Sequence, residues 1–127
     1  MNKQLELVLQ TYDLELTIDE QTQIQDTIGY YCYSNELWMG EDEEGIEAEK
    51  IANQILDLPF SSHQTKVIKF TDKQMDVLIS AMSEYQNLWR YGDDEGVRLG
   101  IVNKDGSLAG ILGEIDKKIE EVLNGQH

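Results

Sequence analysis

The sequence predicts a mostly α-helical, compact domain with room for one short strand or hairpin. Two Thr-x-x-Glu/Gln pairs each precede apolar residues spaced three or four apart, a pattern typical of helix N-termini. Apolar residues make up 40% of the 127 residues, and a chain of this length can bury a self-sufficient core. We therefore expect one globular domain over residues 1–127, composed of an acidic half (1–65) and a near-neutral helical half (66–127).

Apolar spacing in the acidic half predicts three helices. The first is indicated by Leu5, Val8, Leu9 and Tyr12. The second begins at a capping box made by Thr17 and Glu20. The third follows an acidic loop, carries apolar residues from Ala48 to Leu56, and is stopped by Pro59.

The near-neutral half opens with a short β-branched segment, Thr65–Phe70, that predicts a strand or an extended link. Thr71 and Gln74 form a second capping box, and the helix that follows should run to about Tyr91 before a glycine-rich break at 92–96. No internal repeat is apparent in the sequence.

Residues 97–112 admit two interpretations. Val97–Val102 followed by the turn-forming Asn103–Gly106 could open a β-hairpin. Alternatively, Ser107 is a good N-cap for a helix that ends at Gly125, although two glycines inside it would weaken that helix. We favour the helix, with the hairpin as the alternative.

Charge is distributed unevenly along the chain. The first 65 residues hold fourteen Asp and Glu but only two basic residues, Lys3 and Lys50, so this half carries most of the net charge of −15. The acids are densest at Glu41–Glu44, with Glu36, Glu47 and Glu49 close by. Such a field repels nucleic acid and anionic membranes and attracts basic surfaces.

Several features indicate a cytoplasmic protein. Acids and amides interrupt the N-terminal residues, which therefore do not resemble a signal peptide. Apolar runs are far shorter than the ~20 residues that span a bilayer. Cys32 is the single cysteine, which fits a reducing compartment.

The sequence predicts no enzyme, cofactor or metal site. The tract Asn103–Leu108 resembles the middle of a calcium loop, but Ile101 and Leu112 stand where its first and twelfth ligands would be. Cys32 has no basic neighbour that could activate it, and the two histidines are His63 in a polar stretch and the terminal His127. No nucleophile, phosphate-binding or zinc motif is present.

Aromatic residues gather just before the acidic stretch. They are Tyr30, Tyr31, Tyr33 and Trp38, with Leu37 and Met39 beside them. Such residues are favoured at interfaces because they bury a large area and keep a polar or pliable part. The favoured interpretation is that Tyr31 and Trp38 belong to the core and the others are half-exposed, and the alternative is an aromatic anchor patch flanked by glutamates.

Together these features predict an acidic binding protein. It would be an inhibitor or DNA mimic that presents carboxylates to the basic nucleic-acid-binding surface of a nuclease or DNA-binding protein, by analogy with phage anti-defence and immunity proteins. The expected partner-binding residues are Tyr30, Tyr33, Glu36, Trp38, Glu41, Asp42, Glu43, Glu44 and Glu47. The alternative is an assembly adaptor of a phage or secretion particle that docks or dimerises through apolar helix faces.

Overall fold

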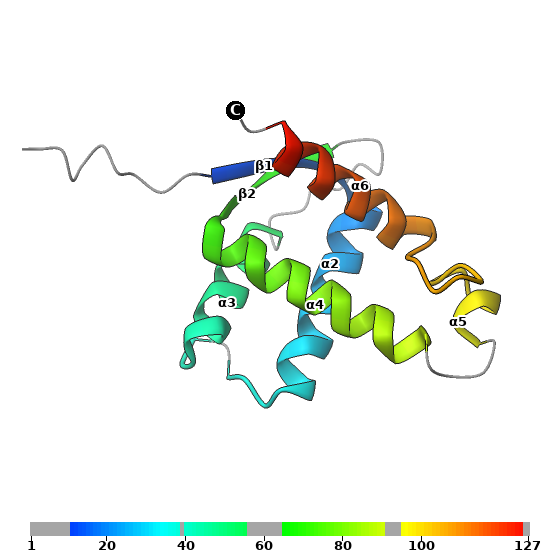
Figure 1. Cartoon of the computed structure of the whole chain (residues 1–127). Helices are drawn as coiled ribbons and strands as arrows, with labels where there is room; N and C mark the ends of the chain where they lie inside the picture. The colour runs from blue at the N-terminus through cyan, green and yellow to red at the C-terminus, as the bar shows by residue number, and fades with distance from the viewer. Residues whose placement is uncertain (1–10, 39, 56–64, 91–94, 126–127) are drawn as a thin grey trace, which may run out of the picture.

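The computed structural model describes residues 11–38, 40–55, 65–90 and 95–125. It confirms a mostly α fold with one two-stranded hairpin-like ribbon (Figure 1). The elements are β1 (Thr11–Thr17), α2 (Ile18–Ser34), α3 (Glu43–Ile55), β2 (Thr65–Thr71), α4 (Asp72–Arg90), α5 (Glu95–Arg98) and α6 (Gly110–Asn124).

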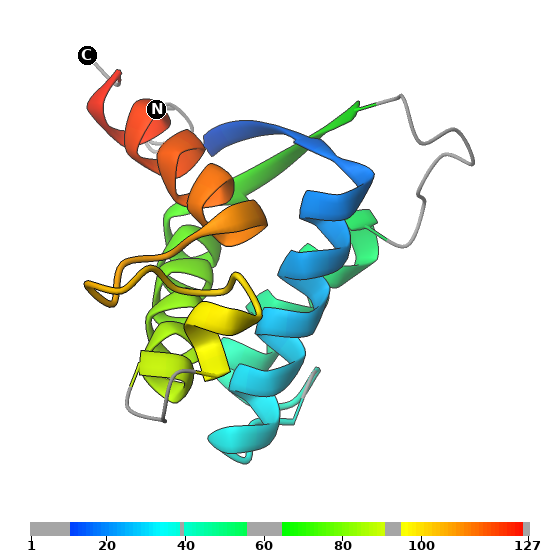
Figure 2. The ribbon, with the colours of Figure 1, turned by 90° about the vertical axis from the view of Figure 1, so that its right-hand side faces the viewer.

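The ribbon joins the two halves of the sequence. β1 and β2 are antiparallel, and Leu14 pairs with Ile68 at the centre of the register. Leu14, Leu16, Ile68 and Phe70 are buried on the inner face, while the alternate residues point outward. Figure 2 shows α2 and α4 extending away from the same side of this ribbon.

Each strand leads directly into a capped helix. Thr17 and Glu20 exchange hydrogen bonds between side chain and backbone at the start of α2, with distances of 2.9 and 3.1 Å. Thr71 and Gln74 do the same at the start of α4, with distances of 3.0 and 3.2 Å. Both predicted capping boxes are confirmed. The two strands also share one burial pattern, so the fold contains a strand–helix unit twice, although no repeat is apparent in the sequence.

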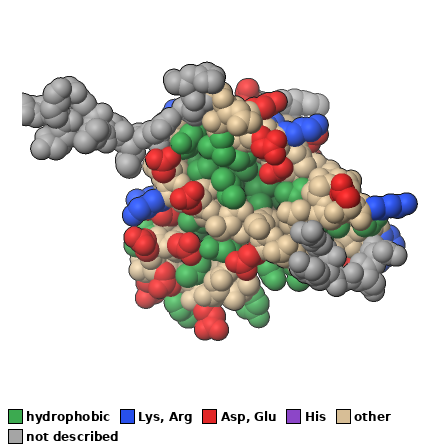
Figure 3. Space-filling view, viewed as in Figure 1, with side chains coloured by type: hydrophobic (Ala, Val, Ile, Leu, Met, Phe, Trp, Pro, Cys, Tyr) green, Lys and Arg blue, Asp and Glu red, His purple; other side chains and the backbone are tan. Residues whose placement is uncertain are grey.

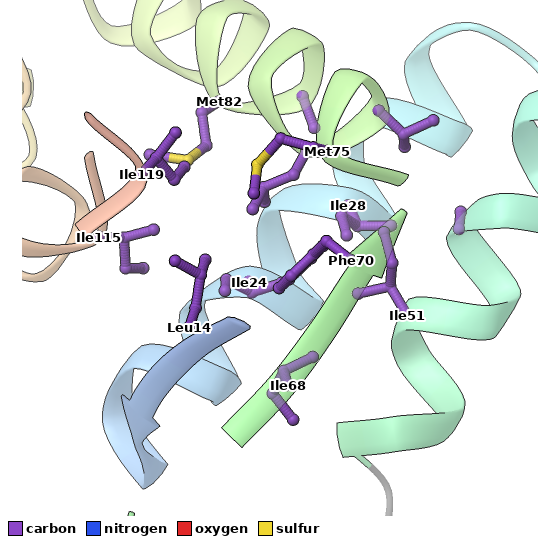
Figure 4. Close-up of a cluster of buried hydrophobic side chains, with 14 of the residues drawn as sticks. Leu14, Ile24, Ile28, Ile51, Ile68, Phe70, Met75, Met82, Ile115 and Ile119 are labelled. Atoms are coloured by element: carbon purple, nitrogen blue, oxygen red, sulfur yellow. The ribbon is translucent and has the colours of Figure 1, made fainter. Parts of the chain in front are cut away.

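The core lies beneath the ribbon and is built from both halves of the chain. Figure 4 shows Leu14, Ile68 and Phe70 of the strands facing Ile24 and Ile28 of α2. The remaining labelled side chains come from the other helices: Ile51, Met75, Met82, Ile115 and Ile119. Because α3 and α6 pack on this shared core, their position relative to the ribbon is fixed by apolar burial.

Side chains satisfy backbone groups on the outer edges of both strands. The side-chain amide of Gln54 on α3 bonds both backbone groups of Lys69. It accepts from the N–H at 2.9 Å and donates to the carbonyl at 2.7 Å. On the other edge, the Lys118 ammonium on α6 donates to the carbonyl of Glu15 at 2.8 Å. An unpaired strand edge can pair with another chain, and these contacts cover part of each edge.

Lys118 also forms the least exposed ion pair among the described residues. Its Nζ lies 2.6 Å from Oε1 of Glu20, and the side chains are 31% and 8% exposed, respectively. Glu20 is the capping-box residue of α2, so one carboxylate ties together the start of α2, the end of β1 and α6.

The structure corrects the prediction for the first helix. Tyr12 lies in β1, where the described segment alternates polar and apolar residues, and this period of two prevails over the helical spacing. Leu5, Val8 and Leu9 lie outside the described residues. The third helix is confirmed, but it begins at Glu43, so part of the predicted acidic loop is helical. Pro59 lies outside the described residues.

The last third combines the two interpretations offered for it. Val102 and Leu108 form an isolated antiparallel bridge around the turn, and the helix starts afterwards at Gly110 with Ala109 as N-cap and ends at Asn124 with Gly125 as C-cap. The prediction of Ser107 as N-cap is wrong because its backbone and hydroxyl bond Asp105 within the turn. Val97 and Arg98 lie in the short helix α5 and not in a strand. No helix in the described segments is long and apolar enough to cross a membrane.

The Glu20–Lys118 pair should contribute measurably to stability. Replacing Lys118 by Met keeps the aliphatic stem but leaves the buried Glu20 carboxylate without its cation, and we expect a loss of about 1–3 kcal/mol in the free energy of unfolding. Lys117→Met is the matched control, because Lys117 is exposed and lies 3.9 Å from Glu114; it should cost less than about 0.5 kcal/mol. Urea denaturation measures both, and equal effects would contradict the role given to Lys118.

Candidate functional site

Carboxylates from both halves of the sequence line a shallow groove between α3 and α4. This acidic groove is formed by Glu43, Glu44, Glu47, Lys73, Asp76 and Val77, and encloses about 150 Å³. A second depression of about 260 Å³ shares Glu47 and Lys73 and extends to Lys50. Figure 3 shows acidic side chains gathered where α3 and the start of α4 lie in Figure 1.

Each α3 carboxylate of the groove is held by a residue from another helix. The Tyr31 hydroxyl donates to Glu44, 3.1 and 3.2 Å from its two oxygens. The Gln74 amide donates to Glu47 at 3.1 Å. Lys73 pairs with Glu43 at 3.4 Å, an exposed contact that contributes little to stability. Glu44 and Glu47 are thus oriented by neutral donors, which leave their charges uncompensated.

One face of α4 supplies acids that the sequence analysis did not select. Asp72, Asp76, Ser80 and Glu84 are spaced four residues apart and therefore share one side of the helix. Asp72 accepts a hydrogen bond from Tyr12, which raises the pKa of that tyrosine. Glu84 accepts from Asn35 at 2.8 Å, at the end of α2. This four-residue spacing can be recognised in the sequence, but these acids were not selected because residues 66–127 carry a low net charge.

The turn that follows α2 has an unusual backbone. Leu37 N–H bonds the carbonyl of Cys32 at 2.8 Å and Glu36 N–H bonds that of Tyr33 at 3.3 Å, the pattern of a Schellman helix end. Glu36 has φ 55°, in the left-handed region where glycine is favoured at this position. A non-glycine residue there costs about 1 kcal/mol.

Trp38 is held by its backbone and not by its ring. Its N–H donates to the Asp42 carboxylate at 2.6 Å, and its carbonyl accepts from the N–H groups of Glu41 and Asp42. The indole is nevertheless 69% exposed, and the Tyr33 ring is 84% exposed. We call Tyr33, Glu36 and Trp38 the aromatic turn. The interpretation that placed Trp38 in the core is wrong, whereas Tyr31 is indeed buried.

The predicted partner-binding residues therefore separate into groups. Glu43, Glu44 and Glu47 line the acidic groove, and Tyr33, Glu36 and Trp38 form the aromatic turn. Glu41, which lies between the two groups in sequence, is exposed. Asp42 has a structural role because its carboxylate fixes Trp38. Tyr30 is half-buried and packs edge-to-face on Tyr85, with ring centroids 5.9 Å apart, so it is a packing residue rather than a free anchor.

Other candidate chemistry finds little support in the described residues. Burial and, secondarily, the charge of Glu44 raise the pKa of the Cys32 thiol, which disfavours a reactive thiolate. Asp105 accepts from the backbone and hydroxyl of Ser107, as a turn residue does. No three His, Cys, Asp or Glu side chains within the described ranges gather in a way that could hold a metal ion. His63 and His127 lie outside those ranges.

Comparison with protein-family models, curated proteins and solved structures finds no match for this chain.

The hydroxyl of the buried Tyr31 side chain, which bonds Glu44, should make stability depend on pH in the alkaline range. Burial and the bond to Glu44 raise the pKa of Tyr31 to about 12, whereas tyrosine in an unfolded chain ionises near ~10. The folded state holds this proton more tightly, so its contribution is complete below pH ~10 and is lost as pH rises towards ~12.

Urea denaturation across this window should show the free energy of unfolding falling more steeply in the wild type than in Tyr31→Phe. Tyr33→Phe is the matched control, because it removes an exposed hydroxyl, and its pH dependence should follow that of the wild type. Identical slopes for Tyr31→Phe and the wild type would contradict a raised pKa of Tyr31 in the folded state.

Proposed function

We propose that this chain is a non-catalytic acidic binding protein whose acidic groove occupies the basic nucleic-acid-binding surface of a partner. The observation that carries the proposal is the convergence of Glu43, Glu44 and Glu47 with Asp76 across the groove, with Lys73 as its one basic lining residue. Lys and Arg side chains placed to neutralise phosphates can also pair with carboxylates.

Two further features support a surface prepared for binding. Tyr31 and Gln74 orient Glu44 and Glu47 before any partner arrives, so less side-chain entropy is lost on association. Their donors are neutral, and the negative field of the groove therefore remains available to steer a basic protein. In this proposal the partner is a nuclease or DNA-binding protein in the cytoplasm, inhibited because a DNA mimic occupies its groove.

The alternative is an adaptor that docks through apolar surface. It draws support from large apolar side chains that are exposed outside the groove, among them Leu88, Leu99 and Ile111. The two proposals differ in their response to salt. If the groove steers the partner, raising the salt concentration from about 50 to 500 mM should screen its charges and slow association. The association rate of apolar docking should be nearly independent of salt.

A four-site amide variant tests the groove directly. Glu43→Gln, Glu44→Gln, Glu47→Gln and Asp76→Asn remove its negative charges. The fold should persist, because a glutamine oxygen at 44 or 47 can still accept from Tyr31 or Gln74. At roughly 0.5–1 kcal/mol per rim charge, we expect the affinity for the partner to fall by about 2–4 kcal/mol.

The matched control changes the same net charge on α6, which lies away from α3 in Figure 1. It carries Glu114→Gln, Asp116→Asn, Glu120→Gln and Glu121→Gln. The partner is captured from the native host with the wild-type chain and titrated with each variant, with duplex DNA as competitor. The proposal predicts loss in the groove variant alone and displacement by DNA; equal losses in both variants, or no competition by DNA, would contradict it.

A further inference from the structure

The aromatic turn exposes two large rings on a backbone that is held by hydrogen bonds. Tyr33 and Trp38 are the two most exposed large hydrophobic side chains among the described residues, at 84% and 69%. Leu37 between them packs against the core, and Asp42 fixes the N–H of Trp38. Packing within the chain accounts for the position of this turn but not for its exposed rings.

Glu36 adds a second unexplained feature. It occupies the left-handed position of the helix end, where glycine would be more stable, and its side chain is exposed. Backbone strain of this kind is concentrated at functional sites, where the surrounding structure holds it in place. The glutamate thus places a carboxylate between the two rings in sequence, at a cost to stability.

The surroundings of the turn favour a cation. The last turn of α2 contains no basic residue, so the negative end of its helix dipole is not compensated there. Glu36 and Glu41 are exposed on either side of Trp38 in sequence, and Glu84 of α4 reaches the same helix end through Asn35.

We propose that the aromatic turn is a docking surface for arginine side chains of the partner. This inference rests on the proposed function and names the chemistry that the partner presents. A guanidinium is planar and weakly hydrated, so it can stack on the Trp38 or Tyr33 ring while it pairs with a neighbouring carboxylate such as Glu36. An ammonium group gains the charge attraction but stacks less well. A second copy of this chain is disfavoured as the occupant because each copy carries a net charge of −15.

Hexaarginine and hexalysine peptides of equal charge provide the probes. Titrations of the ¹⁵N-labelled chain at low salt follow the indole signal of Trp38, which is assigned by its loss in Trp38→Phe. Hexaarginine should bind about two- to five-fold more tightly than hexalysine and should shift that signal. Trp38→Ala should remove the preference for arginine and keep the hexalysine affinity, whereas Leu99→Ala, a truncation of another exposed apolar residue, should change neither.

Glu36→Gly separates the binding role of the glutamate from its effect on the fold. It should raise the melting temperature by about 2–6 °C, because glycine relieves the left-handed conformation, and still weaken hexaarginine binding. A variant that is both less stable and weaker in binding would remove Glu36 from the proposed surface.

The outcomes distinguish this inference from the proposed function. Equal affinities for the two peptides, lost together in the four-site groove variant, would overturn the arginine site and leave the acidic groove standing. Absence of binding by either peptide would overturn both. Retention of the arginine preference in Trp38→Ala would also overturn the assignment to the aromatic turn.

Discussion

The antiparallel pairing of β1 with β2 is the contact from which the rest of the arrangement follows. These strands are far apart in the sequence, and their register places Leu14 against Ile68 over a common core. Because a capped helix starts directly after each strand, the pairing also sets α2 beside α4. The ribbon thereby brings α3, which carries four glutamates, against the α4 face that carries Asp76.

This arrangement places like charges close together, which opposes folding. The fold compensates with apolar burial beneath the ribbon and with hydrogen bonds from neutral donors to the groove carboxylates. The pair between Glu20 and Lys118 lies elsewhere, at the junction of α2, β1 and α6. The cation that stabilises the fold is therefore separate from the surface proposed to bind a partner, so the charge of the groove can change while the scaffold stays intact.

Local signals in the sequence predicted much of the secondary structure. Both capping boxes, the extended segment at Thr65–Phe70 and the long helix after it depend on neighbouring residues, and all are confirmed. Tyr12 was assigned to a helix because its apolar spacing was counted from residues before it, whereas the strand is stabilised by a partner far along the chain. Glu43 was assigned to a loop, although glutamates in the first turn stabilise a helix through their interaction with its dipole.

The candidate site was only partly predictable for the same reason. The acids of α3 and the exposure of Tyr33 follow from composition, but Asp76 and Glu84 acquire a role only when α4 packs beside α3 and α2. Asp42 was predicted to contact a partner, but its carboxylate bonds the N–H of Trp38. That bond depends on a turn that no local sequence pattern predicts. The left-handed conformation of Glu36 could not be predicted from the sequence either, because glycine is the usual signal for such a turn.

Hydrogen–deuterium exchange of the chain alone and bound to its captured partner tests the central claim most directly, namely that the acidic groove and the aromatic turn both contact the partner. N–H groups in the first turn of a helix lack intrahelical acceptors, so those at the start of α3 should exchange readily when free and report protection well. The account predicts slower exchange on binding over the α2–α3 turn and the start of α3, with α6 unchanged. Protection confined to α6 or to the outer face of the ribbon would contradict it.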